Sequence, residues 1–427
     1  MNQPLPRRAF LQSSALASAS LAALQPTRLL RAADSPANTV RVGVIGLGRG
    51  MAHVNNYLGI SGVDLAYICD VDKRRIETAQ ASIGKKQKRL PQGVTDFRRI
   101  LDDKSIDAIS IAAPNFWHAL ATILACAAGK HVYVEKPGSH NPREGELMVA
   151  AALKHKRVVQ LGTQRRSMPW IIEAVQKLRE GAIGTLRMAR CYYANARATI
   201  GIGRVVPVPD WLDYNLWQGP VPERPYKDNL VHYNWHWMWH WGGGEIANNG
   251  PHYLDMVRWG LGVEYPLRVS YGAARLHFQD DQETPDTGAA FYDFGDCAAS
   301  WECSSCHPRR ADPLPMVQFY GEGGSLALEG SGYKIYDMRG KETAAGKGSS
   351  SDAPHFFNFI ETIRGNAKLN AEIAEGQKST LLCHLGNVAW RTGSTLQFDP
   401  KTKKLVKNAD ALKLWGREYR KGWEPKV

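Results

Sequence analysis

A β-rich run followed by three closely spaced glycines is the feature that most constrains this chain. Residues 40–45 (VRVGVI) lead into a glycine-rich stretch, and a helical pattern then continues to Leu58. The glycines are Gly46, Gly48 and Gly50. A second β-rich run ends at Asp70, which lies 22 residues after Gly48. Strand, glycines, helix, strand and acid in this order predict a dinucleotide-binding βαβ unit, because glycines let the backbone approach a pyrophosphate and the acid meets a ribose diol.

Two details bear on how this unit binds its cofactor. Met51 stands where the third glycine is usual and Gly50 comes one residue early, so we expect a tighter turn or a different helix start. Asp70 favours NAD over NADP because a carboxylate repels a 2′-phosphate, although Arg74 and Arg75 follow closely and weaken that preference. The alternative role for Asp70 is a helix N-cap.

Strand and helix patterns continue to alternate after Asp70. β-rich runs occur at residues 106–112, 131–135 and 158–161, and helical patterns occur at 117–128 and 143–156. This alternation predicts an α/β fold in which the N-terminal half is a Rossmann-type, doubly wound parallel sheet.

Length and composition exclude several classes of protein. A chain of 427 residues suits two domains, and its 44% hydrophobic and 22% charged residues are ordinary for a globular protein. Beyond the N-terminus no uncharged apolar run is long enough to cross a membrane, so a multi-span membrane protein is excluded.

The N-terminal segment differs from the rest of the chain. Arg7 and Arg8 precede an uncharged Ala/Ser/Leu stretch at residues 13–24, which resembles a twin-arginine export signal. The alternative is an ordinary amphipathic helix. The sequence allows either cleavage of this segment near Asp34 or its retention as a membrane anchor. We therefore expect a periplasmic or otherwise exported protein, which must hold its cofactor tightly because no soluble nicotinamide pool is available outside the cytoplasm.

The formal charge of +13 suggests nucleic-acid binding at first. Residues 1–33 contain four arginines and no acid, so +9 remains without them. The excess lies in short runs at residues 85–89 and 401–404, without the interleaved aromatic residues of a nucleic-acid groove. We expect no nucleic-acid partner.

Several segments together resemble the Gfo/Idh/MocA family of oxidoreductases (glucose–fructose oxidoreductase and inositol dehydrogenase). The segments are PNFWH, which begins at Pro114, the EKP sequence at 135–137, GTQRRS at 162–167, GGGEIANNGPHYLD at 242–255, HFFNFIETIRG at 355–365 and CHLGNVAW at 383–390. With the leader at 1–33 set aside, the resemblance implies an NAD(P)-binding Rossmann domain at 34–161 and a C-terminal domain at 162–427. That last domain would carry a large open, mostly antiparallel sheet with the substrate pocket, a homo-oligomer interface, and C-terminal helices and a tail that return onto the body.

The resemblance also assigns roles to residues. Lys136 would contact the nicotinamide ribose and the reacting hydroxyl, and His252 would be the general acid or base. Asn248 stands where many relatives have an aspartate, which leaves Lys136 and His252 as the active pair. Asp255 would either orient His252 or form a helix salt bridge. The full set expected to bind the cofactor is Gly46, Gly48, Arg49, Gly50, Asp70, Pro114, Asn115, His118, Glu135 and Lys136.

Two adjacent polar residues follow the strand at 158–161. Gln164 and Arg165 are candidates for contact with a hydroxyl or carboxylate of the substrate. A hydrogen-bond network at the domain hinge is the equally weighted alternative.

An aromatic and histidine-rich segment competes for a functional role. His232, His236 and His240 recur every four residues, as metal ligands on a helix do, but the intervening aromatic residues alternate with period two. An extended strand or loop is therefore favoured and we predict no metal site. Seven of the thirteen tryptophans lie between Trp211 and Trp259, which suits either stacking on sugar rings, with Trp237 contacting substrate, or plain packing.

The sequence Cys303-Ser-Ser-Cys306-His307 matches the c-type haem attachment pattern. It follows a strand pattern of the C-terminal part, so we favour two unpaired thiols over haem, a disulfide or a metal site. The seven scattered cysteines give no disulfide scaffold.

Taken together, these features predict an exported NAD(P)-dependent oxidoreductase that acts on a sugar, sugar acid or polyol. The alternatives are a redox-neutral NAD-dependent glycosidase and a non-catalytic sugar-binding relative.

Overall fold

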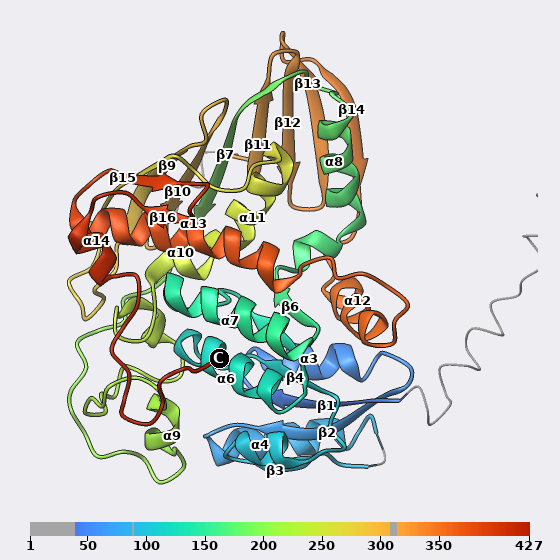
Figure 1. The fold of residues 1–427 in the computed structure, drawn as a ribbon, viewed down its shortest axis with the longest axis vertical. Helices are drawn as coiled ribbons and strands as arrows, with labels where there is room; N and C mark the ends of the chain where they lie inside the picture. The colour runs from blue at the N-terminus through green and yellow to red at the C-terminus, as the bar shows by residue number, and fades with distance from the viewer. Residues whose placement is uncertain (1–38, 88, 308–313) are drawn as a thin grey trace, which may run out of the picture.

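The chain forms two sheets with helices packed against them (Figure 1). The computed structural model describes residues 39–87, 89–307 and 314–427. The expected export signal, with Arg7 and Arg8, lies outside the described residues.

The first sheet has six parallel strands in the order β3-β2-β1-β4-β5-β6. Its strands are β1 (Val40–Ile45), β2 (Val63–Cys69), β3 (Gln92–Val94), β4 (Ala108–Ile111), β5 (His131–Glu135) and β6 (Val159–Gly162). The helices between them are α3 (Gly50–Tyr57), α4 (Lys73–Ile83), α5 (Arg98–Asp102), α6 (Asn115–Ala127) and α7 (Pro142–His155). The central strands are buried on both faces, as helices on both sides of a parallel sheet require. The predicted doubly wound sheet is confirmed.

The second sheet has ten strands in the order β14-β13-β12-β11-β7-β10-β9-β8-β15-β16. Its members are β7 (Leu186–Ala194), β8 (Arg268–Ala274), β9 (Thr287–Asp293), β10 (Ala298–Ser304), β11 (Val317–Gly321), β12 (Gly324–Glu329), β13 (Gly332–Asp337), β14 (Glu342–Lys347), β15 (Leu396–Asp399) and β16 (Lys404–Leu405). Neighbouring strands are antiparallel except β7 and β10, which run parallel. The predicted large, mostly antiparallel C-terminal sheet is therefore confirmed.

Helices cover one face of this second sheet. They are α8 (Pro169–Arg179), α11 (Gly250–Leu261) and α13 (Ile373–Thr392), and all three contribute to one buried cluster with the sheet strands. Residues on the opposite face are more exposed, as at Phe291.

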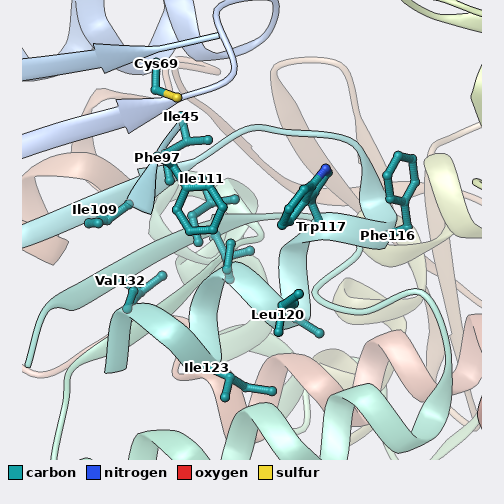
Figure 2. Close-up of a cluster of buried hydrophobic side chains, with 14 of the residues drawn as sticks. Ile45, Cys69, Phe97, Ile109, Ile111, Phe116, Trp117, Leu120, Ile123 and Val132 are labelled. Atoms are coloured by element: carbon teal, nitrogen blue, oxygen red, sulfur yellow. The ribbon is translucent and has the colours of Figure 1, made fainter. Parts of the chain in front are cut away.

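The first sheet has a buried cluster on each face, one against α5, α6 and α7 and the other against α3, α4 and α12 (Ala353–Ile363). Figure 2 shows part of the first of these clusters, in which Ile45, Ile109 and Ile111 from the strands meet Phe97 and Leu120. The same cluster includes tryptophans from the connection between β7 and α10 (Gly244–Asn248), so the two parts of the molecule share buried surface.

Late segments of the chain return to the first sheet. Helix α12 packs beside α3, with Phe356 stacked on Tyr133 of β5. After α14 (Ala409–Lys413) the chain runs to α6, where the C label of Figure 1 lies. In the described part of the chain, every helix is too short or too polar to span a bilayer.

Candidate active site

A cavity of about 900 Å³ lies at the carboxyl ends of β1, β2, β4 and β5, where open α/β sheets bind their ligands. The β7–α10 connection (residues 195–243), which contains α9 (Tyr214–Gln218) and the short helix η3 (Asn234–Trp237), forms part of its wall. Most of the residues singled out from the sequence line this one cavity. They are Gly46, Gly48, Arg49, Asp70, Pro114, Asn115, His118, Glu135, Lys136, Gln164, Arg165, Asn248 and His252.

The glycine-rich turn has no room for a side chain at its first residue, Gly46. Gly46 has φ +83°, and a Cβ there would lie 2.5 Å from the carbonyl oxygen of Ala112. Helix α3 begins at Gly50, which is buried against Val44 and does not line the cavity. The start of the helix one residue before Met51 accounts for the unusual glycine spacing. The helix N-terminus and the bare turn together fit a dinucleotide pyrophosphate.

Asp70 lies at the end of β2 with both carboxylate oxygens held by backbone amides. Leu47 N donates to one oxygen over 2.7 Å and Asp72 N donates to the other over 2.9 Å. The N-cap of α4 is Asp72, so the capping role considered for Asp70 is wrong. Arg74 is bound to Asp72, whereas Arg75 lines the cavity 3.8 Å from Asp70.

Glu135, at the end of β5, is a buried anion with many partners. Its Oε1 is 3.1 Å from Arg49 Nε, 3.1 Å from His53 Nε2 and 3.0 Å from Gln164 Nε2. Burial alone would raise the pKa of Glu135, but His53, Arg49 and Lys136 hold it far below its usual range. Glu135 therefore remains charged and fixes the residues around it.

Lys136 extends from the same strand end towards α10. Its Nζ donates to the carbonyl oxygen of Asn248 over 2.7 Å and to Asn248 Oδ1 over 3.2 Å. Burial lowers the pKa of Lys136, and the charge of Glu135 opposes that shift. The Lys136–Pro137 peptide bond is cis. The Lys136 ammonium is thus held in the cavity by Asn248, which is uncharged. An aspartate at this position would hold the ammonium more strongly.

His252 occupies the first turn of α11 and is also in the cavity wall. Its Nδ1 is buried and has no hydrogen-bond partner among the described residues. Burial, followed by the charges of Arg165 and Lys136, holds the pKa of His252 well below its ordinary value. This direction favours the neutral imidazole, which is the form in which a histidine acts as a general base.

Asp255 does not orient His252. Its carboxylate binds Arg166 through two hydrogen bonds of 2.7 and 2.9 Å and accepts a third from Ser379. Asp255 lies one turn further along α11 and faces this buried ion pair, so the ion-pair alternative is the one observed, although its partner is on another element.

Gln164 and Arg165 differ in how many hydrogen-bond partners their side chains have within the described structure. Both amide hydrogen bonds of Gln164 go to Tyr133 and Glu135, which matches the hydrogen-bond network considered for it. The Arg165 guanidinium lies 4.5 Å from the ring centre of Tyr253 and forms no ion pair within the described ranges. Its Nη1 is buried without a hydrogen-bond partner there. Arg165 also lines the cavity, so the residue is placed to contact a ligand there.

Trp237 is not placed for the expected substrate contact. It is 1% exposed, lies under the Arg197 guanidinium at 3.8 Å and does not line the cavity. The packing alternative describes Trp237 correctly.

The three spaced histidines have separate partners. His232 binds Asp72, His236 contacts the carbonyl oxygen of Tyr233, and His240 contacts the carbonyl oxygen of Pro222. Within the described ranges, no group of three His, Cys, Asp or Glu side chains is arranged to hold a metal ion. The segment forms turns and the short helix η3. It is therefore a loop, one of the two forms favoured from the sequence, and no long helix in the described structure brings the three histidines onto one face.

Cys303 and Cys306 are two buried free thiols, as favoured from the sequence. Cys303 lies in β10, and Cys306 follows it with its Sγ 3.2 Å from Arg197 Nη2.

Sequence reasoning missed several residues in and around the cavity. Tyr193, Tyr233 and Asn249 line the substrate side. His53 is fully buried and outside the lining, and it binds Glu135 from α3. Asp352 precedes α12 and pairs with Arg49 over 2.6 Å. Asn249 lies within the family motif at 242–255 and could have been found from it, whereas none of the family motifs contains the others, which distant segments bring to the site.

Two descriptions of one protein family match this chain. "Oxidoreductase family, NAD-binding Rossmann fold" matches residues 40–163, and "Oxidoreductase family, C-terminal alpha/beta domain" matches residues 198–285 and 330–425. Both belong to Gfo/Idh/MocA. Together they match more than half of the chain, including the whole first sheet, whereas β7 and β9 to β12 of the second sheet lie outside the matched residues.

Curated relatives resemble only part of the chain. An inositol 2-dehydrogenase from Saccharopolyspora erythraea is 34% identical over 165 residues, which cover 38% of this chain and 47% of that protein. A glycosyl hydrolase family 109 protein from a Shewanella species is 38% identical over 105 residues, or 23% of each chain. The matched region thus spans less than half the length of these relatives.

Solved structures share the whole fold at low identity. A WlbA dehydrogenase from Bordetella pertussis, determined with NADH and UDP-GlcNAcA, superposes with a TM-score of 0.65 at 20% identity. The match covers 84% of this chain and 99% of the other. With both family descriptions matched and this fold observed, the chain belongs to the Gfo/Idh/MocA oxidoreductase family.

Proposed function

We propose that this protein transfers a hydride between a tightly held nicotinamide cofactor and a CH–OH carbon of a sugar, sugar acid or polyol. The observation that carries the proposal is the meeting of Lys136 and His252 in the cavity that also contains the glycine-rich turn and Asp70. An ammonium and a neutral imidazole beside one ligand site are the groups that oxidation of a carbinol needs.

The residues present fit a nicotinamide dinucleotide. The glycine turn and the α3 N-terminus would hold its pyrophosphate, Asp70 its adenosine ribose and Lys136 its nicotinamide ribose. When bound, the cofactor supplies a carbon that accepts or returns a hydride.

The chain's own residues would handle the proton. The His252 imidazole, which lines the cavity, would accept the hydroxyl proton as the carbinol is oxidised. The Lys136 ammonium would donate a hydrogen bond to the same oxygen and stabilise its developing negative charge. Glu135 keeps Lys136 in place because its Oε2 accepts from the Lys136 amide over 3.1 Å.

The substrate side favours a ligand with several oxygens. Arg165, Tyr193, Tyr233 and Asn249 line the cavity with Lys136 and His252, and their side chains offer polar contacts to a ligand. Two similar proteins support a sugar, sugar acid or polyol as substrate. One is named an inositol 2-dehydrogenase, and the other was determined in complex with NADH and UDP-GlcNAcA.

NAD is the cofactor that Asp70 favours. A carboxylate held by two backbone amides cannot turn away from a 2′-phosphate and would repel it. Arg75 is too close to Asp70 to provide an independent phosphate site.

A redox-neutral glycosidase is the second candidate. The match to a glycosyl hydrolase family 109 protein favours it, and the same cavity would oxidise and then reduce one sugar. Sugar binding without catalysis is the outcome that would remain if neither activity were found.

We also propose export by the twin-arginine route and assembly into a homo-oligomer. Arg7 and Arg8 before an uncharged stretch support export, and the exposed sheet face around Phe291 supports a subunit interface. Fractionation of cells expressing the full chain tests the first, and light scattering tests the second.

The deciding experiment is to denature the purified protein and identify the released nucleotide by mass spectrometry. We expect about one molecule of NAD or NADH to be released per protein chain. Aglycone release without net NADH would favour the glycosidase. Protein that neither contains nor takes up a dinucleotide would contradict both.

A further inference from the structure

The β7–α10 connection crosses from the second sheet to the adenosine end of the cofactor site. At the turn after β2, Leu212 forms a β-bridge with Asp72. Lys73 N donates to the Trp211 carbonyl over 3.2 Å, and Asp213 N donates to the Val71 carbonyl over 3.0 Å. These contacts begin at the residue after Asp70, so the connection is attached beside the acid expected to bind ribose.

Side chains reinforce this attachment. His232 Nε2 lies 3.0 Å from Asp72 Oδ2, and the Arg74 guanidinium lies 3.6 Å above the Trp211 ring. The amide of Asp72 in turn donates to Asp70. Through Asp72, His232 therefore contributes to positioning the carboxylate of Asp70.

A second attachment joins the connection to α6. Trp117 Nε1 donates to the Trp217 carbonyl over 3.0 Å, and Phe116 packs edge-on against the Trp217 ring. A Cβ at Gly219 would lie 1.9 Å from the Trp117 ring, so the two segments approach as closely as a glycine allows. Figure 2 shows Trp117 and Phe116 beside each other at the edge of the buried cluster.

The C-terminal segment (residues 415–423) holds the connection from outside. Arg420 pairs with Glu223 at 2.7 Å, and its Nη2 donates to Asn215 Oδ1 over 2.6 Å. Trp423 packs edge-on against Trp117 at 5.3 Å. One short segment thus binds both the connection and α6, where it lies in Figure 1.

We propose that the β7–α10 connection and the C-terminal segment form a two-part clamp that closes the adenosine end and makes cofactor release slow. Trp217 and His232 line the cavity on the side of Asp70, so a bound adenosine would lie beneath the connection. Its exit then requires the contacts at Asp72 and Trp117 to open. This inference rests on the proposed function, because it assumes that a dinucleotide binds here.

The test compares NADH dissociation from three forms of the full-length protein. They are the wild type, the double variant Arg420→Ala/Trp423→Ala, and the control Lys421→Ala, whose side chain is exposed between the two. Protein loaded with NADH is mixed with excess NAD, and the loss of bound NADH fluorescence gives the rate. We expect dissociation about tenfold faster in the double variant, because lost contacts act mainly on off-rates. The control should match the wild type.

A second measurement uses the wild type alone, so it does not depend on how a variant folds. Hydrogen exchange followed by mass spectrometry should show slower exchange in residues 209–219 and 415–423 when NADH is bound. An unchanged dissociation rate in a double variant with wild-type circular dichroism, or exchange in both segments indifferent to NADH, would overturn the clamp. Wild-type protein that does not bind NADH would instead overturn the proposed function.

Discussion

The two ends of the cavity are built in different ways. At the adenosine end, residues from the glycine-rich turn to Phe97 come from consecutive βα units. At the substrate end, Lys136 and Arg165 follow strands of the first sheet, whereas Tyr193, Tyr233 and His252 arrive from the second part of the chain. The residues expected to hold the cofactor at the adenosine end are thus set by local sequence, although the β7–α10 connection covers them. The substrate end is set by how the two parts pack.

This difference implies that substitutions at the two ends should affect separate measurements. Changes at the adenosine end should alter nucleotide affinity, and changes at the substrate end should alter turnover or substrate choice. Four predictions test this separation, from the largest expected effect to the smallest.

Lys136→Met should nearly abolish hydride transfer while the cofactor remains bound. The loss of an ammonium that stabilises charge on the reacting oxygen should lower kcat by about a hundredfold to ten-thousandfold. Single-turnover reduction of bound NAD gives the rate, and nucleotide released on denaturation gives the occupancy. Unchanged turnover would remove Lys136 from the proposed mechanism.

Asp70→Ala should act on the opposite end. We expect the Kd for NAD to rise by about tenfold to a hundredfold, because a charge-assisted hydrogen-bond partner of the ribose is lost. The kcat at saturating NAD should change far less. Calorimetric titration measures Kd, and a loss of kcat with unaltered Kd would mean that the two ends are not separable.

Arg165→Met should change which substrates are preferred. If the guanidinium binds a carboxylate in the cavity, KM for a sugar acid should rise by roughly tenfold while KM for a neutral polyol changes little. Steady-state kinetics with one substrate of each kind provide the comparison. An equal effect on both would show that Arg165 contacts a hydroxyl or only supports the fold.

The pH profile of kcat/KM should be broad, and Asn248→Asp should shift it. His252 must be neutral, so activity should fall only well below its ordinary pKa of 6.5. Lys136 must be protonated, so activity should also decline on the alkaline side below pH 10.5. An added carboxylate beside Lys136 Nζ would raise its pKa and move the alkaline limb upward, with only a several-fold change in the maximum rate. An acid limb at or above 6.5 would contradict the assignment of His252.

How much could be predicted from sequence follows the same division. Most strands and helices to Leu161 were predictable because each βα unit carries its own hydrophobic pattern and glycine or acid signal. The exceptions are α4, β3 and α5, which lie between Asp70 and residue 106 and were not predicted. The alternation also placed the end of β5 at Glu135, just before Lys136.

The substrate side was predictable only where a family motif marked it. Asn248 and His252 lie within such a motif, but Tyr233 and Asp352 reach the cavity through long connections without one. Trp237 was misassigned because a cluster of tryptophans in sequence does not say which rings face solvent and which are covered, here by Arg197. The partner of Asp255 could not be predicted either, because Arg166 lies on a segment far away in sequence.

The most direct test of the account is transfer of a deuterium label. Protein loaded with NAD is incubated with inositol or a sugar acid deuterated at its carbinol carbons, and the nucleotide is then released and weighed by mass spectrometry. The account predicts labelled, reduced nucleotide from the wild type and none from Lys136→Met. Unlabelled nucleotide from wild-type protein that binds both ligands would contradict the claim that the two ends of the cavity form one site for hydride transfer.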